Sequence, residues 1–465
     1  MFCNWRDCQE YRSLGLPLST TSNEACKLYD ATLTQYVGWY DDDSMGGLEN
    51  CVAQMLSADP QFVMGHVLKN GLDLMGTGRS VALDTDFKRD IDAMVTLSDS
   101  GPINQREQLH VQAIKLWADG QMRSACDKWE TILVDNPLDM LAIKFAHDAY
   151  FYLGLHPQLR DSPARCLPNW KPSMPLYSDL LGIYSFGLEE TNLYSQAEKV
   201  ARQSLEMKKQ SAWSTHTLCH VMEMEGRQNE GIGFLSRTLN DWTKCGMLAC
   251  HNFWHWALYH IEKNEHQGAL DIFDTEIAVS LKKSGAMLDV VDVCSLLYRL
   301  ELEGIDVGSR WNDTFEIIRP HVEDHILAFN DVHIMMACLG SNSKEIVQKM
   351  MDSLRGFIRD GSGDNHDLTR DIGMPMCEAF LAYDEGDYGK AVELLLPLRY
   401  DVIKIGGSHA QRDIFNLLLI HAALKSDIAE HKKLARHLLM ERKALKENSP
   451  MTDRLIAKAM ATHVD

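Results

Sequence analysis

Apolar residues recur at spacings of three and four along almost the whole chain, and the alternation expected of β-strands is hard to find. This spacing is typical of amphipathic α-helices, and only 13 prolines are present to interrupt them. Local signals mark helix ends: Ser22 precedes one helix, and Asn136, Gly226 and Gly386 follow others. We therefore predict an all-α protein with short connections, except for longer loops at 76–84, 154–176 and 360–368.

The length of 465 residues exceeds the limit of about 250–300 residues for a single core, so the chain must form domains or an array of small units. Several windows match the tetratricopeptide pattern of a small residue, a turn glycine and an alanine. In the clearest window these are Ala113, Gly120 and Ala125, and the interval from Ala197 to Gly231 is one full repeat of 34 residues. One helix pair cannot bury its apolar face alone, so neighbouring pairs stack.

We predict tetratricopeptide-like helical-hairpin repeats that form a right-handed α-solenoid superhelix. Residues 1–20 are expected to be an N-terminal extension, and residues 21–462 a single continuous solenoid. The clearest repeats are 104–137, 178–209, 212–243, 250–283 and 372–404.

The charge balance of 46 basic and 66 acidic residues opposes binding to nucleic acids and to anionic membranes. No stretch of 18 apolar residues occurs, and the first residues are charged where a signal peptide would be apolar. The twelve cysteines include no CxxC pair, so we interpret them as reduced core thiols. These features predict a cytoplasmic protein.

Two segments with the same histidine spacing stand out in the middle of the predicted array. THTLCH carries His216 and His220, and CHNFWH carries His251 and His255, so each pair lies one turn apart on one helix face. The repeat phase places them on the concave wall, together with Glu223 and Trp254. Four imidazoles and a carboxylate are candidate ligands for zinc or another divalent metal. The alternatives are that these side chains line a peptide or ligand groove, or hydrogen-bond neighbouring helices.

Further polar side chains interrupt other first helices and suggest a continuous polar floor in the groove. Such a floor could bind a peptide or a small molecule; hydrogen bonding between repeats is the alternative. Asp289 in particular could lie in a first turn and complement the helix dipole. These candidate groove residues are His147, Asp148, Asp289, Asp292, Asn330, His333 and Arg412.

Five long segments resemble the tetratricopeptide repeat protein 38 family. The resemblance covers the chain from about residue 8 to the end and implies an all-helical tetratricopeptide fold and a cytosolic location. It implies no reaction, so it supplies no catalytic residues. The segments are LPLSTTSNEACKLYDATLTQYVGW, KFAHDAYFYLG, GIYSFGLEETNLYSQAEK, LACHNFWHWALY and IGGSHAQRDIFNLLLIHAAL.

The function predicted from these patterns is that of a scaffold, not an enzyme, which binds a peptide or protein partner in its concave groove. The alternative is a small-molecule or metal-binding protein, or an enzyme, that uses the histidine-rich groove. HExxH is absent, and the glycine pairs lack the context of a phosphate-binding loop. No catalytic residue can therefore be assigned.

Overall fold

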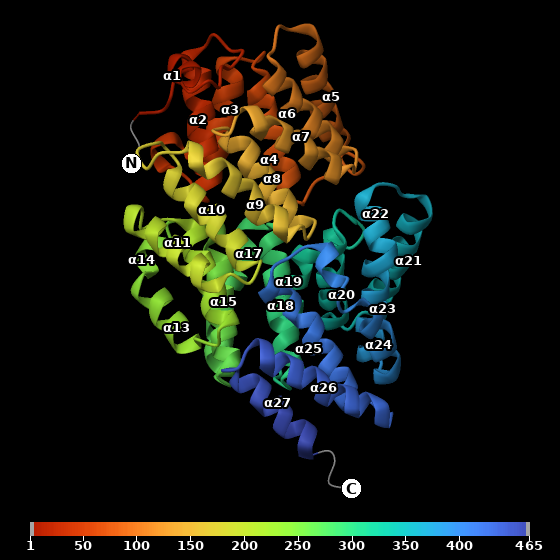
Figure 1. The fold of residues 1–465 in the computed structure, drawn as a ribbon. Helices are drawn as coiled ribbons and strands as arrows, with labels where there is room; N and C mark the ends of the chain where they lie inside the picture. The colour runs from red at the N-terminus through yellow and green to blue at the C-terminus, as the bar shows by residue number, and fades with distance from the viewer. Residues whose placement is uncertain (1–3, 462–465) are drawn as a thin grey trace. The chain divides into compact units, whose positions relative to one another are not determined.

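The computed structural model describes residues 4–461, and every regular element within this range is a helix (Figure 1). Successive helices pack as antiparallel hairpins, for example α6 (Gln105–Ala118) with α7 (Met122–Asp135) and α23 (Met374–Asp384) with α24 (Tyr388–Leu395). The predicted all-α, tetratricopeptide-like fold is confirmed. Every helix in the described part is too short or too polar to span a bilayer.

The chain divides into two compact units, and the single continuous solenoid over residues 21–462 stays a prediction. The first comprises the residues up to Thr217 together with Asn240–Ala249; the second comprises Leu218–Leu239 and the chain from Cys250 onward. Besides α6 and α7, the first unit contains α1 (Cys8–Ser13), α2 (Asn23–Gly38), α3 (Gly47–Ala58), α4 (Val63–Met75), α5 (Thr85–Ser100), α8 (Met140–Tyr152), α9 (His156–Cys166), α10 (Tyr177–Glu189) and α11 (Tyr194–Met207).

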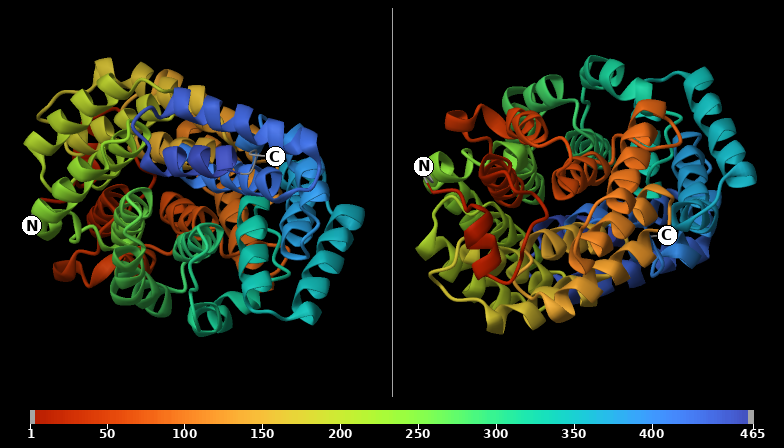
Figure 2. Two further views of the ribbon diagram at one scale, coloured as in Figure 1. Left: turned by 90° about the horizontal axis from the view of Figure 1, so that it is seen from below. Right: turned by 90° about the horizontal axis from the view of Figure 1, so that it is seen from above.

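The chain passes between the units within α12 (Ala212–Met224), α14 (Leu239–Trp242) and α15 (Gly246–Glu262). In the second unit, α26 (Ala429–Leu445) and α27 (Pro450–Ala461) run side by side (Figure 2). Besides α23 and α24, this unit contains α13 (Gln228–Arg237), α16 (His266–Ile272), α17 (Ala278–Ser284), α18 (Met287–Leu302), α19 (Arg310–Ile318), α20 (Ala328–Gly340), α21 (Lys344–Asp360), α22 (Asp364–Leu368), α25 (His409–Lys425), α26 (Ala429–Leu445) and α27 (Pro450–Ala461).

The predicted helix ends agree with the structure. Ser22 is the N-cap of α2, and its side chain accepts a hydrogen bond from the backbone of Ala25. Gly226 and Gly386 follow α12 and α23 with φ of 69° and 82°, a left-handed conformation that costs glycine little. The chain therefore turns sharply between the two helices of a hairpin.

Two of the three predicted long loops contain helices. Residues 154–176 include α9, which has Pro157 in its first turn and Pro163 in its interior. Residues 360–368 include α22. The prolines made the first segment look like a loop, although proline is tolerated in the first turn of a helix. Residues 76–84 do connect α4 and α5 without a helix, as predicted.

Candidate functional site

Three helices carry the polar side chains of the candidate site at helical spacing, and all of these side chains belong to the second unit. His220 and Glu223 lie on α12, His251 and His255 on α15, and Asp292 on α18. Residues three or four apart on a helix share a face. The face of α15 therefore presents its two histidines to the polar residues of the helices that precede and follow it.

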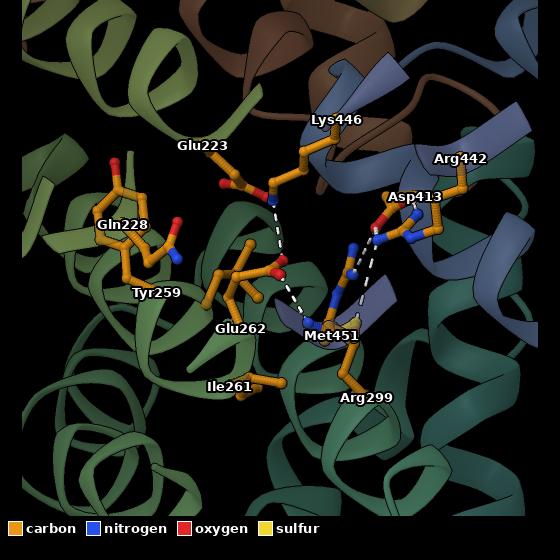
Figure 3. A pocket seen from close by; sticks show the side chains of 11 residues that line it. Glu223, Gln228, Tyr259, Ile261, Glu262, Arg299, Asp413, Arg442, Lys446 and Met451 are labelled. Atoms are coloured by element: carbon orange, nitrogen blue, oxygen red, sulfur yellow. Dashed lines mark hydrogen bonds and ion pairs between the residues drawn. The ribbon is translucent and has the colours of Figure 1, made fainter. Parts of the chain in front are cut away.

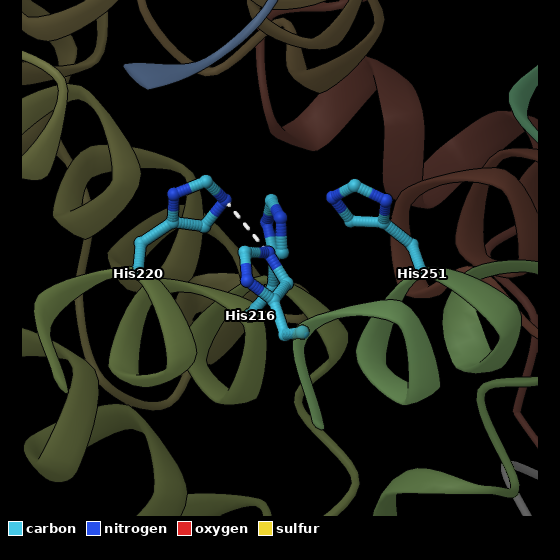
Figure 4. A group of neighbouring side chains, drawn as sticks. His216, His220 and His251 are labelled. Atoms are coloured by element: carbon cyan, nitrogen blue, oxygen red, sulfur yellow. Dashed lines mark hydrogen bonds between the residues drawn. The ribbon is translucent and has the colours of Figure 1, made fainter. Parts of the chain in front are cut away.

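His255 connects α15 to α12 through both of its ring nitrogens. Its Nδ1 lies 3.0 Å from Oε2 of Glu223, and its Nε2 lies 3.0 Å from Nε2 of His220. The contact with His220 is the dashed line in Figure 4. Both histidines are fully buried, so their ring nitrogens cannot bond to solvent. These contacts give the nitrogens hydrogen-bond partners within the protein.

His251 connects α15 to α18. Its Nδ1 lies 2.8 and 2.9 Å from the two carboxylate oxygens of Asp292, and its ring stacks on Trp254 with the centroids 5.0 Å apart. The indole nitrogen of Trp254 donates in turn to Oγ of Ser295, 2.9 Å away. The ring of His251 is thus held at one edge by a carboxylate and on one face by an aromatic side chain.

Three histidines of the second unit converge. His220, His251 and His255 each place a ring nitrogen within 4.8 Å of those of the other two, and the rings of His220 and His251 are drawn in Figure 4. Convergent imidazoles can bind a transition metal, or can exchange protons through a chain of hydrogen bonds. This cluster contains three of the four histidines proposed from the sequence as metal candidates.

Burial shifts the protonation equilibria of the cluster. It raises the pKa of Glu223 to about 7 and that of Asp292 to about 6, and it lowers the pKa of His220 well below its ordinary value. The neighbouring rings of His255 and His251 lower the pKa of His220 further. A buried imidazole in this setting is neutral near pH 7 and retains a lone pair for a ligand.

Three of the predicted site residues belong to the first unit. His216 packs against Phe186 and Trp213, with ring centroids 4.9 and 5.5 Å apart. Asp148 accepts a hydrogen bond of 2.5 Å from the hydroxyl of Tyr36, and its neighbour His147 lies 3.4 Å from it. Both His147 and His216 are buried among aromatic rings of their own unit.

Sequence reasoning missed a fully buried lysine beside Asp148. Nζ of Lys144 pairs with Asp148 and lies 4.3 Å from the ring centre of Tyr36 and 4.9 Å from that of Trp39. The ion pair and the aromatic faces compensate a charge that burial would otherwise disfavour. The signal in the sequence was the spacing of four residues between lysine and aspartate within an apolar helix.

The remaining predicted residues are not among the converging histidines, although the charge of Arg412 helps to lower the pKa of His220. Asp289 is in the first turn of α18, where Ser280 and Ser284 each donate a hydrogen bond of 2.7 Å to it. His333 is on α20 and bonds the carbonyl of Phe329. Asn330 is buried on α20, and Arg412 on α25 lies 3.0 Å from Nδ1 of His409.

A small chamber lined by charged side chains lies beside the cluster in the second unit (Figure 3). Glu262 accepts from Lys446 at 2.9 Å and from the backbone of Met451 at 3.0 Å, and Asp413 pairs with Arg442. The cavity volume of about 20 Å³ suits a single water molecule. Glu223 lines this chamber and also forms a hydrogen bond with His255, so it connects the chamber to the histidine cluster.

A larger cavity of about 270 Å³, here called the α25–α26 pocket, opens to solvent from the same region. Leu419 and Leu438 supply apolar surface, and Tyr400 and Leu445 are exposed by 77% and 80% where they line the pocket. Arg399 pairs with Glu441, and its guanidinium carbon lies 4.5 Å from the ring centre of Tyr400. An apolar wall with charged and aromatic groups around it is typical of a binding pocket.

Sequence reasoning did not single out most of the charged residues of the chamber. Glu262 and Arg299 lie near the C-terminal ends of α15 and α18, beyond the positions predicted for the groove. Arg442 lies on α26, and Lys446, which follows α26, is 184 residues from its partner Glu262. No local spacing relates residues so far apart. Of the chamber residues, only Glu223 was among the predicted groove residues.

No protein-family model matches the chain. Among solved structures, it is similar to the APC/C hetero-tetramer Cut9–Hcn1, with 13% identity and a TM-score of 0.43 over 97% of this chain and 74% of the other. It is also similar to the human IFIT1 dimer with PPP-AAAA (12%, 0.39, 96% of each chain) and to yeast Tom70 (12%, 0.30, 93% and 81%). Scores of this size carry no argument about function, which must come from the site itself.

Proposed function

We propose that the chain is a helical-repeat scaffold that binds a short segment of a protein partner in the α25–α26 pocket. The observation that supports this most directly is the exposure of Tyr400 and Leu445 beside an apolar wall. Aromatic side chains are enriched at protein interfaces, where a few large anchors supply most of the binding energy. A cavity of about 270 Å³ accommodates one or two side chains of a bound segment.

The pocket is a better candidate surface than the predicted polar floor. All thirteen residues proposed from the sequence for the floor or its metal site are at most 8% exposed, so they offer little area to a partner. Tyr400 and Leu445 need no rearrangement to make contact. The net charge of −20 favours a basic or neutral segment over an acidic one.

Site-specific photo-crosslinking in the full-length protein would test the proposal. A photoreactive phenylalanine analogue in place of Tyr400 is expected to capture a defined partner, and Leu445→Glu in the same chain should reduce the captured amount at least about tenfold. The matched control places the analogue at Val134, which is 80% exposed on α7. Identical captured proteins at both positions, or no effect of Leu445→Glu, would contradict it.

A second candidate function is binding of a small molecule, because the α25–α26 pocket and the charged chamber share Glu223, Asp413, Arg442 and Lys446. An anionic or zwitterionic compound could use these charges. Competition of such a compound with the crosslink at Tyr400 would distinguish a shared pocket from separate sites.

We further propose that the chain belongs to the tetratricopeptide repeat protein 38 family and acts in the cytoplasm. The support is the resemblance of the five sequence segments. Localisation of a fluorescent fusion tests the second statement; accumulation in an organelle would contradict it.

A further inference from the structure

The histidine cluster has a feature that neither partner binding nor the pocket requires. Two of its three imidazoles each hold a carboxylate at Nδ1: His251 holds Asp292 and His255 holds Glu223. A neutral imidazole that donates Nδ1–H to a carboxylate has its lone pair on Nε2. Histidine ligands of protein-bound metals are oriented by this kind of contact.

We propose that His220, His251 and His255 bind a divalent transition-metal ion such as zinc, with Glu223 and Asp292 as the carboxylates that orient two of the ligands. The site lies within the second unit and does not require His216, which belongs to the first. The proposal is independent of the partner-binding function.

The distances in the cluster suit such an ion. The Nε2 atoms of His220 and His255 are 3.0 Å apart, and two nitrogens bound to one tetrahedral zinc at 2.0–2.1 Å lie about 3.3 Å apart. A hydrogen bond between two imidazoles also has this length. The third ring favours the metal, because a nitrogen of His251 lies within 4.8 Å of the nitrogens of the other two rings.

The chemical nature of the donors selects the class of metal. Imidazole nitrogens suit zinc, copper, nickel and iron, whereas magnesium and calcium need oxygen ligands. The two carboxylates behind the rings can offset the charge of a divalent ion in an interior where isolated charge is costly.

Trp254 and Ser295 add a structural reason for a fixed geometry. The indole stacks on His251 and is itself anchored to Ser295, so the ring of His251 is restrained on a face as well as at an edge. A ligand held in place before binding loses less entropy when the metal arrives.

Metal titration of the full-length protein tests the proposal. After removal of bound metal with a chelator, zinc should bind with one equivalent per chain in competition with a chromophoric chelator, and should raise the thermal midpoint. Cobalt(II) should give the visible absorption of a site with nitrogen ligands and low coordination number. The unmodified protein alone can overturn the proposal. It would do so if zinc bound at well below one equivalent per chain and cobalt(II) gave the spectrum of the hydrated ion.

Three variants locate the site. His251→Gln should lose zinc binding at least about 100-fold, whereas Asp292→Asn should retain one equivalent with affinity reduced about 10–100-fold. His421→Gln is the matched control, because His421 is also buried in the second unit but lies outside the cluster. Equal zinc affinity in His251→Gln and His421→Gln, with both variants folded by circular dichroism, would overturn the assignment.

Failure of the metal site would not affect the proposed partner binding. Crosslinking at Tyr400 can be repeated with metal-free protein, and the two results are read separately. If His251→Gln does not fold, the cobalt spectrum of the unmodified protein and the affinity of Asp292→Asn still decide the outcome.

Discussion

His333 illustrates how burial sets the protonation state of a single residue. It is fully buried on α20, where its Nδ1 donates a hydrogen bond of 2.8 Å to the carbonyl of Phe329. Burial lowers its pKa to about 4, and the charge of Arg299 acts in the same direction. The folded protein therefore keeps this ring neutral at pH values where the unfolded chain binds a proton, since the ordinary histidine pKa is about 6.5.

Replacement of His333 by glutamine should change how stability depends on pH. Because the pKa is lower in the folded state, unfolding is favoured as the pH falls from about 6.5 to 4, by about 3 kcal/mol at the lower limit. His333→Gln should cost about 1–2 kcal/mol at pH 7 but remove the part of the pH dependence that comes from His333. Other buried histidines, such as His421 with a pKa lowered to about 3, keep the remainder. Denaturant unfolding at several pH values measures both, and parallel pH profiles for the two proteins would contradict the prediction.

At the scale of elements, single close contacts decide how tightly helices of the second unit pack. Gly231 on α13 faces the ring of Tyr259 on α15, and a Cβ at this position would lie 2.4 Å from that ring. The hydroxyl of Tyr259 donates to the carbonyl of Cys219 on α12 at 2.7 Å. The glycine thus permits a contact that joins α12, α13 and α15, as the repeat pattern predicted for a small residue.

Two glycines of α13 make a matched test of this contact. Gly231→Ala should destabilise the protein by about 1–3 kcal/mol, because overpacking against Tyr259 outweighs the better helix propensity of alanine. At Gly233 the nearest group is the movable end of Arg237, so Gly233→Ala should be neutral or stabilising by up to about 1 kcal/mol. Thermal or denaturant unfolding compares them; equal effects would contradict the assigned packing.

At the scale of the whole molecule, each unit has an interior rich in buried apolar residues, and the cysteines belong to these interiors. The eleven cysteines in the described part are buried and form no disulfide, which agrees with the interpretation as core thiols. Cys3 lies outside the described residues. Burial raises the pKa of Cys245 to about 11 and that of Cys166 to about 12, so little thiolate forms near neutral pH.

The rate at which the thiols react with a reagent should measure the burial of the cysteines of both units. In a Cys3→Ser variant, the eleven thiols should react with a disulfide reagent at pH 8 at least about 100-fold more slowly than in the denatured protein, because both access and thiolate are limited. All eleven should react after denaturation without reductant. A lower count would indicate a disulfide, and rapid reaction in the native state would contradict the burial.

The sequence by itself determined the helices and the hairpins, because both depend on local interactions. Apolar spacing selects a helical face, Ser22 caps a helix through its neighbours, and Gly226 permits a left-handed turn. The same local geometry placed each histidine pair on one face. Prediction from local signals failed at α9, because its two prolines indicated a loop although the helix contains both.

Only the tertiary structure decided which polar groups meet. His255 finds Glu223 and His220 on α12, and His251 finds Asp292 on α18, across separations of 32 to 41 residues. The contact of Lys446 with Glu262 spans 184 residues. Such pairs depend on how helices stack, and stacking follows from side-chain packing along whole helix faces, which periodicity does not record. The sequence determined which imidazoles share a helix face, and the packing of α12, α15 and α18 brought three of them together.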